Sequence, residues 1–202
     1  MGGPFEYGNQ AACVALRPVL IRVRDMGTLV AVYRNPDEKG CFSVGYVVSI
    51  GRSDFTLRCV SPGGEEDGAT TCFITDVYKV TEESRYLGRI QHLIARRGHV
   101  LGESLEAAYE PEVSSCFIEE FKRAKHLKQV VAVVLRRAPE ALIAGFVEHV
   151  SEGAVQIAEV THEGEPDGRT TFRTDDILRL DRNDRDGQVL ALCYRHRTHV
   201  AS

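Results

Sequence analysis

The sequence predicts a mainly β protein with flanking α-helices, built from two small five-stranded barrels in tandem. Two observations carry this prediction. The stretch from Gly40 to Val80 aligns without a gap with the stretch from Glu140 to Leu180, so the chain contains an internal duplication. Within each copy, short β-branched and apolar runs are separated by turn-rich stretches, a pattern typical of strands.

The two copies share glycines and aspartates at fixed positions. Ten of the 41 aligned positions are identical. The identical positions that define the structural repeat include Gly45 and Gly145, Asp67 and Asp167, Gly68 and Gly168, and Asp76 and Asp176. A glycine inside a strand marks a bend or a close backbone approach, and an Asp-Gly pair tolerates positive φ. We therefore expect a bent second strand and a tight turn at each Asp-Gly pair.

Five strands are expected in each copy. The first covers 28–34 and 130–136, the second 42–50 and 142–150, the third 54–60 and 154–160, with a fourth after the Asp-Gly pair and a fifth after Asp76 or Asp176. An alternative alignment pairs 73–75 with 172–174 and implies a one-residue bulge, and the sequence leaves both alignments open. Five short strands, strongly bent at the second, describe a small SH3-like barrel.

Helical patterns flank both copies. Apolar residues recur at helical spacing at Leu87, Ile90, Leu93 and Ile94, and at Phe117, Ile118, Phe121 and Leu127. We expect a further helix over 10–24, which Pro18 must begin or kink, and a strand or a helix at 187–197. These elements divide the chain into a first barrel domain at 1–98, a linker at 99–112 and a second barrel domain at 113–202.

The composition is that of an ordinary globular protein. A formal net charge of -4 argues against a general nucleic-acid coat, which depends on clustered Lys and Arg. The apolar stretches are shorter than the roughly 18 residues of a transmembrane helix, and the start of the chain lacks a signal-peptide pattern. We expect a cytoplasmic protein without membrane contact, in which the six scattered cysteines are reduced thiols.

The strand motifs also point to a family. The residues concerned are Val133 to Leu135, Gly145 to Val150, Val155 to Val160 and Thr174 to Leu180, with Gly45 to Ile50 and Thr75 to Val80 in the first copy. A helix followed by VxVxL, GxVxxV, VxIxxV and a closing DxI resembles the Sm-like fold, over about residues 25 to 82 and 115 to 182. PRC-type barrels share the glycine and the closing motif, so another SH3-like barrel stays an alternative.

The resemblance implies single-stranded RNA as a partner. Sm-like proteins bind RNA around the pore of a ring, which they assemble by pairing the fourth strand of one subunit with the fifth of the next. A homo-oligomer through exposed strand edges is therefore expected, with the two linked copies supplying one such contact internally. The pocket of the family uses an Asp and an Asn after the second strand and an Arg-Gly or Lys-containing pair before the fifth. These loops read IGRSDF and VSEGAV, then ITDV and TDDI, so no pocket residue is carried over.

Basic residues on the predicted helices form the candidate nucleic-acid-binding set. These residues are Arg17, Arg22, Arg24, Lys122, Arg123, Lys125 and Lys128. They would contact phosphates if the helices share one face, or they are the solvated sides of amphipathic helices. The aromatic pair Tyr46 and Phe146 could stack on a base, but their place beside the bend glycines favours a core position.

No catalytic or metal motif is present. The carboxylates of GEEDG and GEPDG lack the spacing of a calcium loop, the histidines include only one close pair, His196 and His199, and no GxSxG elbow occurs. The resulting hypothesis is a non-enzymatic RNA-binding protein without a cofactor. The alternative is a protein-interaction or assembly module that keeps the scaffold and binds no nucleic acid.

Overall fold

A computed structural model describes residues 4–34, 42–96 and 114–200. The chain divides into two units, of which the first contains 1–67 and 72–116 and the second contains 68–71 and 117–202. The predicted linker at 99–112 lies outside the described residues. Each unit is therefore described by itself.

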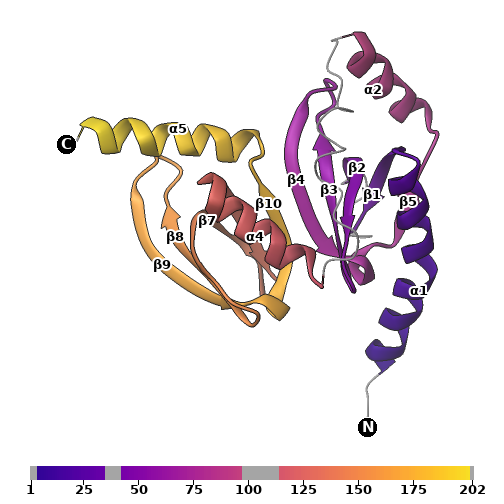
Figure 1. Cartoon of the computed structure of the whole chain (residues 1–202), viewed down its shortest axis with the longest axis horizontal. Helices are drawn as coiled ribbons and strands as arrows, with labels where there is room; N and C mark the ends of the chain where they lie inside the picture. Colours follow the sequence, from indigo (N-terminus) through magenta and orange to yellow (C-terminus); the bar gives the residue numbers. More distant parts are fainter. Residues whose placement is uncertain (1–3, 35–41, 97–113, 201–202) are drawn as a thin grey trace. The chain divides into compact units, whose positions relative to one another are not determined.

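The first unit contains a helix, five strands and a second helix. Its elements are α1 (Pro4–Asp25), β1 (Leu29–Tyr33), β2 (Phe42–Ile50), β3 (Asp54–Val60), β4 (Glu66–Phe73, of which 68–71 belong to the second unit), the 3-10 helix η1 (Ile74–Asp76), β5 (Lys79–Thr81) and α2 (Arg85–Arg96). Figure 1 labels the helices and strands. Pro18 lies inside α1, which excludes the alternative that it begins the helix and leaves the alternative that it kinks the helix. The helix also begins earlier than the predicted residue 10.

The second unit repeats this order of elements. Its elements are α4 (Cys116–Leu127, of which Cys116 belongs to the first unit), β6 (Val130–Leu135), β7 (Ala138–Val150), β8 (Ala154–Val160), β9 (Pro166–Arg173), the 3-10 helix η3 (Thr174–Asp176), β10 (Ile177–Arg182) and α5 (Arg185–Val200). The segment left open between strand and helix is thus the helix α5. The two 3-10 helices lie one hundred positions apart, which favours the gapless alignment over the one with a bulge.

The described strands confirm a mainly β fold with flanking helices but not two separate closed barrels. They form one ten-stranded sheet that does not close, in the order β5-β1-β2-β3-β4-β10-β6-β7-β8-β9. All three residues of β5 pair with β1, from Ala31 opposite Thr81 to Tyr33 opposite Lys79. In each repeat, the fifth strand therefore pairs with the first strand, and the fourth strand is the last of the five in the order.

The mid-strand glycines sit where two backbones nearly touch. Gly45 lies opposite Cys59, and Gly145 lies opposite Glu159. A Cβ atom at Gly45 would overlap the carbonyl group of Arg58, and one at Gly145 would overlap that of Ala158. The lack of a side chain thus permits the close approach of the third strand to the second, as the sequence predicted.

The tight turns lie before the Asp-Gly pairs and not at them. Asp67 and Gly68 are inside β4, and Asp167 and Gly168 are inside β9, so the predicted turn position is wrong. The turn of the first unit is closed by the Gly64 amide, which donates to the Ser61 carbonyl at 2.9 Å. Gly68 and Gly168 do adopt positive φ, at 68° and 94°. The register of β8 with β9 shifts beside Gly168, so this glycine occupies a bulge.

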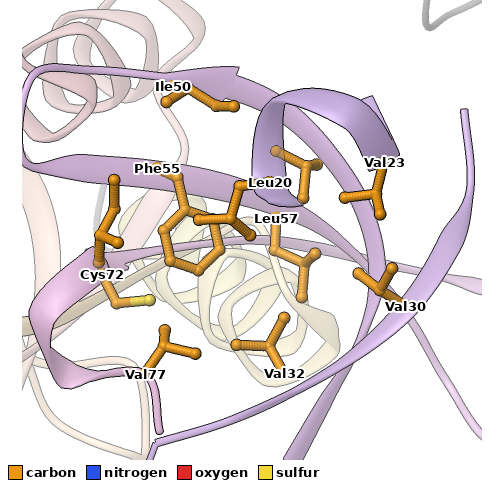
Figure 2. Close-up of a cluster of buried hydrophobic side chains, with 11 residues drawn as sticks. Leu20, Val23, Val30, Val32, Ile50, Phe55, Leu57, Cys72 and Val77 are labelled. Atoms are coloured by element: carbon orange, nitrogen blue, oxygen red, sulfur yellow. The ribbon is translucent and has the colours of Figure 1, made fainter. Parts of the chain in front are cut away.

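The helix α1 covers one face of the sheet in the first unit. Figure 2 shows Leu20 and Val23 of this helix beside Phe55 and Leu57 of β3 and Val32 of β1. All five side chains are buried. The burial of a large apolar side chain contributes about 1.5 to 3 kcal/mol, so this cluster fixes α1 on the sheet.

The helix α2 covers the opposite face of the same unit. Leu29 and Ala31 of β1 join a second buried cluster with Leu87 and Ile90 of α2. Successive side chains of a strand point to opposite faces, so the residues of β1 belong alternately to this cluster and to the cluster under α1. Four consecutive residues of β1 are therefore buried, which matches its unbroken apolar sequence.

In the second unit, two of the four residues predicted on the apolar side of α4 are buried, and Ile118 is only partly buried. Phe117, Phe121 and Ala124 are buried, whereas Leu127 is 50% exposed. The phenyl ring of Phe121 lies 6.2 Å from that of Phe172 on β9. Leu127 is the last residue of the helix, so the chain turns away from the core there. The yellow helix α5 in Figure 1 covers the turn between β8 and β9.

Candidate nucleic-acid interface

The three basic residues predicted on α1 all have partners in the first unit. The Nη1 atom of Arg17 donates to the carbonyl oxygens of Gly51 and Arg52, in the loop after β2. Arg22 forms a two-pronged ion pair with Glu82, at 2.7 and 3.0 Å. This carboxylate raises the pKa of the Arg22 guanidinium. Arg24 pairs with its neighbour Asp25 at 2.9 Å. These partners satisfy much of the hydrogen-bonding capacity that phosphate contacts would require.

The four basic residues predicted on and after α4 belong to the second unit. Lys122 pairs with Glu119 at 2.8 Å, and Arg123 pairs with Glu120 at 3.3 Å. Lys125 and Lys128 are exposed and form no ion pair with a carboxylate of the described residues. Lys128 follows the end of α4 with a φ of 51°. Among the four, these two lysines are the better placed to meet an external anion.

The loop after the second strand contacts the 3-10 helix in both repeats. The Ile74 amide donates to the Ser53 carbonyl at 2.9 Å, and the Thr174 amide donates to the Gly153 carbonyl at 3.2 Å. In the second unit the Thr174 hydroxyl also donates to the Glu152 carbonyl at 3.1 Å. The repeat residues Asp76 and Asp176 end these 3-10 helices. The two loops to which the Sm-like resemblance pointed are thus in contact in each unit.

A buried aspartate of β3 binds Ser115 and Cys116, which belong to the same unit. The Asp54 carboxylate accepts hydrogen bonds from the Ser115 hydroxyl at 2.8 Å and from the Cys116 amide at 3.1 Å. Cys116 is buried, and this burial, with the charge of Asp54, raises the pKa of its thiol to about 12. A protonated, buried thiol is a poor nucleophile. Asp54 and Cys116 therefore form a structural contact and not a reactive site.

The aromatic pair Tyr46 and Phe146 contributes to packing. Tyr46 is half-buried beside the cluster under α2, and burial raises the pKa of its phenol. The Phe146 ring lies 5.0 Å from the ring of Tyr194 on α5. Each side chain thus packs on the face covered by the last helix of its unit but stays half-buried, outside the fully buried core that their place beside the bend glycines favoured.

A group of aromatic and cationic side chains in the first unit was missed by the sequence analysis. Its members are Tyr33, Phe42, Tyr78, Lys79, Tyr86 and Arg89, which we call the aromatic–cation cluster. They come from β1, β2, β5 and α2 and from the residue before β5. These segments are far apart in the chain, so no local motif marks the cluster. The sequence offered one signal for it, which is that the corresponding residues of the second copy are mostly aliphatic or acidic.

Other kinds of site lack support in the part of the chain that the structure describes. No three His, Cys, Asp or Glu side chains among 4–34, 42–96 and 114–200 are arranged to hold a metal ion. Over the same ranges, every helix is too short or too polar to cross a bilayer.

Comparisons with known proteins leave the family open. No family model matches the chain, and neither a curated protein nor a solved structure matches it significantly.

Proposed function

We propose that this protein is a non-enzymatic, cytoplasmic RNA-binding protein that consists of two Sm-like units in tandem. The observation that carries the proposal is the strand order of the two repeats, in which the fifth strand lies beside the first and the fourth is last. A helix precedes the strands in each unit, and the two loops that form the pocket of Sm-like proteins are in contact. The resemblance to the Sm-like fold then supplies the ligand class, which is single-stranded RNA.

Direct binding measurements test this function. Short U-rich and A-rich RNAs are titrated with the full chain in a filter-binding assay at two salt concentrations. We expect saturable binding in the micromolar range that weakens as the salt concentration rises, because phosphate contacts release counterions. A complete lack of saturable binding to either RNA would overturn the proposal.

A second candidate is an assembly module that has kept the scaffold and lost the nucleic-acid site. The observation that favours it is the pairing of Arg22, Arg24, Lys122 and Arg123 with carboxylates. For this function, a partner protein should stay bound in a pull-down after RNase treatment. Loss of every partner after RNase would instead favour the RNA-binding function.

We also propose that the protein forms a homo-oligomer in which the edge strands of neighbouring chains pair. In the described sheet, β5 and β9 stand at the two ends of the strand order. Exposed edges of this kind pair readily with another chain. Light scattering should give a molar mass that is a multiple of 22.4 kDa and that falls on dilution. A mass of one chain at every concentration would contradict this part of the proposal.

A further inference from the structure

The aromatic–cation cluster of the first unit brings four rings and two cations together. The Tyr33 ring is the centre, 4.9 Å from the ring of Phe42 and 6.1 Å from that of Tyr78. Phe42 in turn contacts Tyr86 of α2 edge-on, at 5.5 Å. The Lys79 ammonium lies 4.1 Å from the centre of the Tyr33 ring. The Arg89 guanidinium lies 5.3 Å from the centre of the Tyr86 ring.

This cluster is open to solvent on part of its surface. The Tyr78 side chain is 47% exposed, and Lys79 and Arg89 are also exposed. Within 4–34, 42–96 and 114–200, no carboxylate forms an ion pair with Lys79 or Arg89, in contrast to Arg22 and Lys122. Each of the two cations contacts a ring and retains N–H donors for an external anion.

The fold does not require these residue types. In the first unit, Tyr33 lies opposite Phe42 on one side and opposite Lys79 on the other. The same register in the second unit places Val134 between Leu142 and Arg179. The positions one hundred residues after Tyr78, Tyr86 and Arg89 are Leu178, Asp186 and Val189. The second copy thus forms the same strands and helix without the aromatic group, so packing alone does not explain it.

We propose that the aromatic–cation cluster binds a single-stranded segment of nucleic acid. An unpaired base would stack on the exposed Tyr78 ring, and the adjacent phosphates would accept hydrogen bonds from Lys79 and Arg89. Aromatic rings with nearby cations are the usual elements of single-strand sites, because every base offers a π-face and every nucleotide a negative charge. A duplex would bind poorly, because its bases are already stacked on each other. This inference rests on the proposed RNA-binding function and locates it in the first unit.

A matched pair of variants tests the location of the site. Fluorescence anisotropy is measured with a labelled oligo-U RNA and the full chain. Tyr78→Ala should weaken binding about 5- to 100-fold, as expected for the loss of one stacked base. Leu178→Ala, the counterpart in the second unit, should leave the affinity within about twofold. Tyr78→Phe should retain wild-type affinity because the ring is kept, and thermal melting confirms that each variant is folded.

The salt dependence of RNA binding tests the role of Lys79. Lys79→Gln should weaken binding and reduce the slope of log affinity against log salt concentration by about one. The wild-type chain should prefer the single strand over the complementary duplex by at least about tenfold.

The outcomes separate the two proposals. If wild type binds RNA and Tyr78→Ala binds equally well, the cluster is not the site, whereas the proposed function stands. Equal affinity for single strand and duplex would also overturn the stacking site. If wild type binds no RNA, both proposals fail.

Discussion

Glu82 and Arg182 occupy equivalent positions in the two repeats, and each forms an ion pair with the helix that precedes its strands. In the first unit, Glu82 accepts from Arg22 of α1 at 2.7 Å. In the second unit, Arg182 donates to Glu120 of α4 at 2.5 Å and to the Gln129 amide oxygen at 2.6 Å. The signs of the charges are exchanged between the copies. An ion pair between the preceding helix and the end of the last strand is therefore present in both copies, although the residue types that form it differ.

These two ion pairs should differ strongly in their effect on stability. The side chains of Glu120 and Arg182 are only 6% and 13% exposed, whereas Arg22 is 51% exposed. Arg182→Ala leaves a buried carboxylate with only the longer contact to Arg123, so the free energy of unfolding should fall by about 3 kcal/mol. Arg22→Ala should cost much less, because solvent screens the exposed pair with Glu82. Urea denaturation measures both values, and equal losses would contradict the difference in burial.

The bend glycine of the second repeat should not tolerate a side chain. Gly145→Ala places a Cβ atom 2.8 Å from the carbonyl carbon of Ala158, so the strands must separate. We expect a loss of about 1 to 3 kcal/mol in the free energy of unfolding, which is typical of overpacking. Gly153→Ala is the matched control, because nothing lies within 4 Å of a Cβ atom there. A stability of Gly145→Ala as high as that of the control would refute the close approach.

The buried carboxylate of Asp54 should stabilise the first unit. Asp54→Ala removes the acceptor of the Ser115 hydroxyl and the Cys116 amide, and unsatisfied buried donors cost about 1 to 3 kcal/mol. Asp54→Asn keeps one acceptor oxygen and should lose less. Replacement of the exposed Glu152 by Ala serves as the control and should change stability by less than about 0.5 kcal/mol. Chemical denaturation compares the three variants.

The Cys116 thiol should be unreactive until the protein unfolds. Its pKa in the folded chain is about 12, above the ordinary thiol value of 9.0. Folding thus favours the protonated form, and the resulting stabilisation is complete below about pH 9 and is lost as the pH rises through the folded pKa. At pH 8, iodoacetamide should label the half-buried Cys193 first and Cys116 only after addition of urea. Peptide mass spectrometry measures the order of labelling. Equal labelling rates of Cys193 and Cys116 in the native protein would contradict the prediction that the Cys116 thiol is unreactive.

The strands could be predicted well because their burial follows the sequence pattern. The ranges 42–50, 54–60 and 154–160 were predicted with the bounds that the structure shows. In β3 and β8, apolar side chains at alternate positions, such as Phe55 and Leu57, point into the core, which is the pattern that period-two reasoning detects.

The errors arose where tertiary contacts override a local rule. Asp67-Gly68 is a typical turn dipeptide, but the positive φ of Gly68 serves a strand, because its backbone packs against Asn183 and Asp184. Pro18 lacks an amide proton, yet α1 continues through it and is held on the sheet by Leu20 and Val23. Sheet closure depends on long-range pairing, which the sequence of one strand does not encode.

The candidate site was the least predictable part. The basic residues of the helices were found by charge alone, but the carboxylates that pair with Arg22 and Arg123 could be assigned only from the fold. The aromatic–cation cluster consists of residues from four separate elements and the residue before β5, so no local motif reveals it.

The strand pairing of the two repeats can be measured directly by nuclear magnetic resonance. In a deuterated sample of the full chain, we expect cross-strand backbone NOEs between Val32 and Val80 in the first unit. Equivalent NOEs should join Val133 and Leu180 in the second unit. NOEs that instead join residues 79–81 to the fourth strand alone, or a different partner for the last strand in each half, would show that the chain does not contain two copies of one β unit.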